Sequence, residues 1–122
     1  MHLSAVKAFA ASDQTTPLIV ASNIAGIFAE FDMTLESLFA GVGVLGTTSG
    51  GTRIQIQKNG VDMLSTPITI DHGDTTSLTA TTPPVISVSS ITRGDRISVD
   101  IQDISGGATE AGLQIVLNGI RA

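Results

Sequence analysis

The sequence contains no cysteine, tryptophan or tyrosine, and four phenylalanines make up its whole FWY aromatic content. Without cysteine the chain has neither disulfides nor thiolate metal sites, so its stability must come from packing. Charged residues are also scarce, at 14% against 42% apolar residues and a mean hydropathy of +0.35, whereas an ordinary soluble domain has about 25% charged residues. This thin charge cover predicts exposed apolar surface that is used for association.

Positive charge is scarce as well, because six Lys and Arg residues stand against eleven Asp and Glu, for a net charge of -5. A chain with this balance repels phosphate backbones, so no nucleic-acid partner is expected. The most apolar region is interrupted by Ser22, Asn23, Glu30 and Asp32, and no run approaches the ~20 apolar residues of a membrane helix. No membrane partner is expected either.

A length of 122 residues fits one domain with a single core. We expect residues 1–16 to form an extended N-terminal arm and residues 17–122 to form the folded domain. Such an arm could add a strand to the sheet of a neighbouring protein.

Alternation of apolar and polar residues with period two dominates from residue 34 onward and predicts strands. The clearest case is residues 52–58, where Ile54 and Ile56 face one side and Arg53, Gln55 and Gln57 face the other. Similar patterns cover residues 68–70, 85–91 and 96–103. Leu113, Ile115 and Leu117 mark the last predicted strand. In residues 96–103, Ile97, Val99 and Ile101 are expected to face the core.

The two residues that follow the strand predicted at residues 52–58 are Asn59 and Gly60, and they predict a tight hairpin. Both tolerate the positive φ that a type I′ turn requires. The return strand is expected to point Val61, Met63 and Ser65 inward.

Two upstream segments complete the pattern. Residues 18–31 are expected to be extended, and residues 35–45 read as a strand that is buried on both faces, with Gly41 and Gly43 at a bulge or a close approach. The count is seven or eight short strands with frequent turns, and no βαβ unit. The sequence therefore predicts an all-β fold, an antiparallel β-sandwich or jelly roll with an extended N-terminal arm.

Four segments carry a family resemblance: Ile54–Gly60, Met63–Thr66, Ile91–Ile101 and Ala111–Leu117. The first, third and fourth correspond to a lysine-asparagine-glycine hairpin, a glycine-aspartate turn before an alternating strand, and a closing strand after a glycine-rich loop. In this respect the chain resembles small structural domains of bacteriophage virions, over roughly residues 17–120.

The resemblance implies a capsid cement (decoration) protein that binds adjacent major capsid subunits on the capsid surface of the virion. It also implies a homo-oligomer, with a homotrimer favoured. The alternative is a module of a head or tail fibre that recognises a host receptor or glycan. Because no collagen-like, coiled-coil or β-helical shaft is present, the cement role is the expected one.

Three motifs could carry chemistry, and each has a structural explanation. Gly41–Gly46 spells a dinucleotide fingerprint but no helical pattern follows it. Arg93–Asp95 spells an integrin-recognition tripeptide but serves as a turn. His72 with Asp71 and Asp74 could bind a metal, yet three such residues in one glycine-containing loop are typical of a turn.

Catalysis is not expected, because the serines and threonines have no partner histidine. Asp100 and Asp103 are separated by odd spacing, which predicts opposite faces of a strand. The sequence therefore predicts a protein that is not an enzyme, with no catalytic, cofactor-binding or metal-binding residues.

Overall fold

The computed structural model describes residues 4–44, 50–104 and 110–121, with side chains from residue 7 onward. Within these residues the fold is all-β, as predicted, and a single turn of 3₁₀ helix, η1 (Ser77–Thr79), accompanies the strands. No helix in these ranges is long and apolar enough to cross a membrane. The strands are β1 (Ser4–Ala10), β2 (Ala21–Phe28), β3 (Met33–Gly41), β4 (Gly51–Lys58), β5 (Val61–Asp62), β6 (Leu64–Thr66), β7 (Ile68–Asp71), β8 (Val85–Ile86), β9 (Ser90–Ile91), β10 (Arg96–Asp103) and β11 (Gln114–Arg121).

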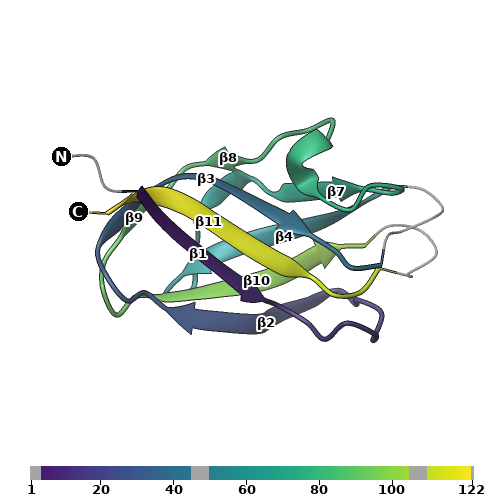
Figure 1. The fold of residues 1–122 in the computed structure, drawn as a ribbon, viewed down its shortest axis with the longest axis horizontal. Coiled ribbons are helices and arrows are strands. Elements are labelled where there is room, and N and C mark those ends of the chain that lie inside the picture. Colours follow the sequence, from purple (N-terminus) through teal and green to yellow (C-terminus); the bar gives the residue numbers. More distant parts are fainter. Residues whose placement is uncertain (1–3, 45–49, 105–109, 122) are drawn as a thin grey trace.

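The strands form two main antiparallel sheets. Sheet A has the order β1-β11-β3-β9, and sheet B has the order β2-β10-β4-β5, with β7 also paired to β4. A separate ribbon joins β6 and β8. The chain changes sheet between β1 and β2, β2 and β3, and β3 and β4, and again from β9 to β10 to β11. Figure 1 shows the result as two layers, with β1 and β11 of sheet A in front of β10 of sheet B.

One apolar core fills the space between the sheets, with side chains from both. Burial of one such side chain stabilises the fold by about 1.5–3 kcal/mol relative to its exposure. The period-two prediction is confirmed at the centre of the strands, where alternate residues are nearly inaccessible. These are Ile54, Ile56, Ile68, Ile70, Ile97, Val99, Ile101, Leu113, Ile115 and Leu117.

The segment predicted as an N-terminal arm contains a strand of sheet A. Residues 4–10 form β1, which pairs with β11 from the Ser4↔Ile120 register to the Ala10↔Gln114 register. The segment is therefore extended, and over this range it is paired with the chain's own sheet.

On one side of the molecule, β1 is the edge strand of sheet A and β2 is the edge strand of sheet B. Each of these strands has a feature that hinders pairing with a strand of another chain. Lys7 of β1 forms an ion pair of 2.6 Å with Glu30, across the gap between the sheets. In β2, Asn23 has a φ of 55° and its N–H donates to Asp100, within a break in register. An inward-pointing charge and a bulge both blunt a strand edge against further pairing.

The predicted type I′ hairpin is confirmed, since Asn59 and Gly60 have φ values of 51° and 84°. Met63 on the return strand is fully buried, as predicted. The prediction is wrong for Val61, which adjoins the hairpin tip and is 60% exposed. It is also wrong for Ser65, which is exposed because the chain leaves the ladder there.

The side chain of Gln55 replaces a backbone hydrogen-bond partner where the chain after Met63 leaves its pairing with β4. The Met63 N–H donates to the Ile56 carbonyl, and Ile68 pairs with Ile54. The four residues between Met63 and Ile68 therefore lie opposite Gln55 alone. The Gln55 side chain donates to the Leu64 carbonyl and accepts from the Leu64 N–H, at 2.9 and 3.1 Å. Gln55 faces away from the core as predicted, yet it is only 3% exposed, because its amide replaces a backbone partner.

The expectation that residues 35–45 are buried on both faces is wrong for the part that the structure describes. In β3, Leu35, Leu38 and Ala40 are buried, whereas Glu36 and Ser37 are exposed. Glu36 is an extra residue at a register shift against β11. Leu45 lies outside the described residues.

The expectation that Asp100 and Asp103 lie on opposite faces is also wrong. Asp100 stands opposite Gln55 and Asp103 stands opposite Arg53, so Gln102 is an extra residue in β10. Gln55 and Arg53 are two residues apart on β4, and therefore both aspartates share the outer face of sheet B.

Substitution of Gln55 by Leu should lower the free energy of unfolding by about 1–3 kcal/mol, because two buried backbone groups of Leu64 lose their partner. Gln57→Leu is the matched control, since Gln57 bonds only the exposed Asp62 side chain; its cost should stay within about 0.5 kcal/mol. Urea denaturation measures both. Equal destabilisation of the two variants would contradict the role given to Gln55.

Candidate functional site

The glycine-rich segment that resembles a dinucleotide fingerprint lies at the end of β3 and beyond it. A Cβ on Gly41 would stand 3.2 Å from the Thr75 carbonyl, so this glycine permits a close approach of two backbone segments. Gly43 donates to the Ala111 carbonyl at 2.9 Å. Leu45 and Gly46 lie outside the described residues. The described glycines therefore have structural roles.

The Arg93–Asp95 tripeptide forms the turn before β10, as predicted. Gly94 has a φ of 93°, a conformation that favours glycine. The Asp95 carboxylate accepts from the Thr92 N–H at 2.8 Å and from the Asn59 side chain at 3.0 Å. These bonds, led by the one from Thr92, lower the pKa of Asp95 below its ordinary value.

The side chains of Asp71, His72 and Asp74 have separate partners. The Asp71 carboxylate accepts from the N–H and the hydroxyl of Thr81, and the His72 Nδ1 lies 3.0 Å from the Gly50 carbonyl. The Asp74 carboxylate accepts from the Thr79 hydroxyl. Within the described ranges, no three His, Asp or Glu side chains are grouped in a way that could hold a metal ion.

The outer face of sheet A is a broad surface with almost no charge. Its central row joins Ala8, Val116 and Phe39 across β1, β11 and β3. Among the outward positions with described side chains only Glu36, at the bulge, is charged; Lys7 points to the other side and Arg121 stacks 4.6 Å above the Phe31 ring. We call this surface the sheet A face; it comprises Ala8, Ala10, Thr34, Ser37, Phe39, Gly41, Ser90, Gln114, Val116, Asn118 and Ile120.

Sheet B has the opposite character on its outer side. Arg96 lies over Gly26 there and donates to the Asn23 side chain at 2.7 Å. Charges of both signs follow along β4 and β10 in Arg53, Asp100 and Asp103. The charge that the sequence does possess is therefore concentrated away from the sheet A face.

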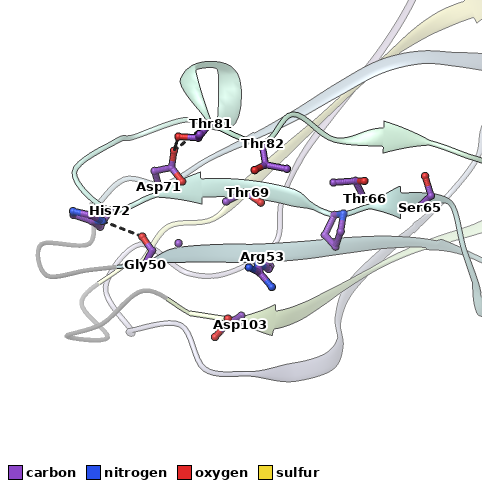
Figure 2. A pocket seen from close by; sticks show the side chains of 12 residues that line it. Gly50, Arg53, Ser65, Thr66, Thr69, Asp71, His72, Thr81, Thr82 and Asp103 are labelled. Carbon is purple, nitrogen blue, oxygen red and sulfur yellow. Dashed lines mark hydrogen bonds between the residues drawn. The ribbon is translucent and has the colours of Figure 1, made fainter.

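A polar groove of about 710 Å³ lies at one end of sheet B. Its size falls within the range of small-molecule sites. Figure 2 shows Arg53 between Asp103 and Thr69, and these three residues stand opposite one another on β10, β4 and β7. The further lining residues are Gly50, Gly51, Ser65, Thr66, Pro67, Asp71, His72, Thr81 and Thr82.

Arg53 is the central donor in this groove. Its backbone is paired with β7 and β10, whereas its guanidinium makes no hydrogen bond or ion pair with any other residue that the structure describes. The same holds for the hydroxyls of Thr66, Thr69 and Thr82. Asp103 accepts from the Ile104 N–H through Oδ1, which leaves Oδ2 as an acceptor. The groove therefore presents donors and an acceptor side by side.

Comparison with known proteins gives no match to a family model, to a curated protein or to a solved structure. The function must therefore be argued from the surface and the groove themselves.

Sequence reasoning identified neither of these two features. The outward positions of residues 114–120 are uncharged, and this pattern indicates part of the sheet A face. The sequence does not show that β1 and β3 are the neighbours of this strand, so the face as a whole could not be predicted. Arg53 and Asp103 are 50 positions apart in the chain. Only the register of three strands brings them together with Thr69.

Asp95 should contribute to the dependence of stability on pH. Because its folded pKa lies below the unfolded value, its contribution is present above about pH 4 and is lost as the pH falls through the folded pKa. The Asp95→Asn variant should lose less stability than the native chain between neutral and acid pH. Urea midpoints measured across that range provide the test, and parallel pH profiles would contradict it.

Proposed function

We propose that the chain is a virion structural protein that assembles through its faces rather than a catalyst, and specifically a capsid cement protein of a bacteriophage head. In this role a homotrimer sits on the capsid surface and binds adjacent major capsid subunits. The sheet A face is the observation that carries the proposal.

The strand order supports a jelly roll. Eight strands, β1 to β4, β7 and β9 to β11, form two sets of four with the orders β1-β11-β3-β9 and β2-β10-β4-β7. Taken in chain order, these eight strands alternate between the two sets, except that β4 and β7 both belong to the second. A double sheet of eight antiparallel strands is the jelly-roll architecture, which occurs in viral capsid proteins. The fold alone leaves the function open.

Charge supports the sheet A face as the contact between identical copies. With a net charge of -5, two copies repel each other through most orientations. The residues of the sheet A face are uncharged, and Glu36, at the bulge in β3, is the one charged outward residue of sheet A among the described side chains. Identical copies can therefore meet there without placing like charges opposite one another.

The extent of this face limits how much surface such a contact can bury. Strands β1, β11 and β3 have seven, eight and nine residues, whereas β9 has two. Three strands of about eight residues span ~26 by ~14 Å, or ~370 Å² per copy. Two such faces bury ~740 Å², below the ~1000 Å² of a specific interface, so residues around the face must add to the contact. Three copies that turn this face toward a common axis would form the trimer that the family resemblance implies.

The capsid contact is proposed on the side where β2 forms the edge. Ile19, Val20 and Phe28 are 68%, 57% and 66% exposed there. No charged residue occurs between Asp13 and Glu30. Exposed apolar side chains at about 25 cal/mol per Å² of buried area supply binding energy to a capsid subunit.

Substitution of Val116 by Lys should convert the oligomer to a monomer, because it places a positive charge from each copy at the centre of the contact. Gln102→Lys, which changes an exposed residue of β10, is the control and should keep the native mass. Light scattering after size-exclusion chromatography measures both. A native protein that is already monomeric would refute assembly through this face.

A second test uses the particle. Virions that contain the chain should carry many copies over the head surface in a cryo-EM reconstruction. A few copies confined to the tail would refute the cement role. Phe28→Lys should weaken rebinding to heads that lack the chain by about tenfold or more, since a buried aromatic anchor contributes at least ~1.4 kcal/mol, while the variant keeps the native oligomeric mass.

A further inference from the structure

We propose that the polar groove on sheet B is a binding site for a neutral saccharide, and that Arg53 and Asp103 form the hydrogen bonds that recognise it. The site is separate from the sheet A face, so the binding itself does not depend on the proposed function; only the avidity described below rests on the proposed assembly. It rests on the groove geometry and on the hydrogen-bonding groups that remain available in it.

The arrangement of donor and acceptor fits a pair of neighbouring hydroxyls. Arg53 and Asp103 stand directly opposite each other on adjacent strands, which places their backbones about 5 Å apart. A sugar hydroxyl can accept from a guanidinium and donate to a carboxylate at the same time. A vicinal diol therefore satisfies both side chains, whereas an apolar ligand satisfies neither.

The charge of the lining favours a neutral ligand over an acidic one. Two carboxylates, Asp71 and Asp103, lie in the groove with the single guanidinium of Arg53. An anionic ligand that paired with Arg53 would be repelled by Asp103 on the adjacent strand and by Asp71 further along the groove, at an energetic cost. A neutral polyol avoids that repulsion and uses the same hydrogen bonds.

The walls add further contacts of the same kind. The hydroxyls of Thr66 and Thr82 line the groove (Figure 2), and neither has a hydrogen-bond partner among the residues described. Pro67 offers the apolar surface on which the face of a sugar ring can rest. None of the four phenylalanines lines the groove, so the binding of one sugar unit should be weak.

The oligomer would compensate for weak binding at each site. The groove lies on the outer side of sheet B, away from the sheet A face, and stays accessible when copies associate through sheet A. Several grooves on one particle can then bind a surface polysaccharide with an avidity that far exceeds the affinity of one site.

The test is a titration of the full chain, labelled with nitrogen-15, with D-glucose, D-galactose, D-mannose and N-acetyl-D-glucosamine. At least one sugar should shift the amide signals of groove residues. Arg53→Met and Asp103→Asn should each weaken that binding about tenfold or more, because hydrogen bonds to charged groups are lost. Arg93→Met, which alters an exposed arginine outside the groove, should leave it unchanged.

Three results would overturn the proposal. They are the absence of shifts with all four sugars, shifts that persist in Arg53→Met, and binding of D-glucuronate in preference to the neutral sugars. The amide spectrum of each variant also reports whether it is folded. None of these outcomes bears on the mass of the oligomer, so failure here is distinct from failure of the assembly proposal.

Discussion

Burial of one face of each sheet against the other is the constraint on which the rest of this structure depends. Alternate residues of β4, β10 and β11 enter the core, so the intervening residues must face outward. The chain has few charges with which to cover two outer faces. It concentrates them on sheet B and leaves the outer face of sheet A nearly neutral. On this asymmetry rest the proposed assembly through sheet A and the proposed ligand site on sheet B.

The edges of the sheets are poorly suited to pairing with a strand of another chain. An edge strand exposes unpaired backbone groups and invites a strand from another chain. Here β1 carries Lys7, which turns inward to Glu30, and β2 is interrupted at Asn23. The Lys7 side chain also lowers the pKa of Glu30, through a hydrogen bond and charge attraction. Because residues 4–10 are also paired with β11, the proposed assembly is assigned to contact between faces and not to strand addition from the N-terminal segment.

Periodicity was sufficient to predict the core, because a residue such as Ile56 or Val99 is buried by the same alternation that defines its strand. Turn chemistry was equally local, as Asn59 and Gly60 show. The bulges were not predictable, because an extra residue such as Gln102 is defined only against the register of the neighbouring strand. One such residue reversed the expected relation between Asp100 and Asp103.

Buried polar groups were the other feature that the sequence did not reveal. Gln55 was expected on an exposed face, and Glu110 gave no signal, although it is only 2% exposed and accepts a hydrogen bond from the buried Thr52 hydroxyl. Their burial depends on partners in other strands. A polar residue in an alternating strand is compatible with either environment, so the pattern alone cannot separate the two.

The same dependence on register explains why the groove exists. The bulge in β10 turns Asp103 to the face that carries Arg53, and the departure of the chain at residues 64–67 raises Pro67 and Thr66 beside it. Without the bulge, the alternation of β10 would direct Asp103 to the other face. Two local departures from regular pairing therefore produce a hollow with a donor and an acceptor on the outer face of sheet B, which the proposed assembly through sheet A leaves open.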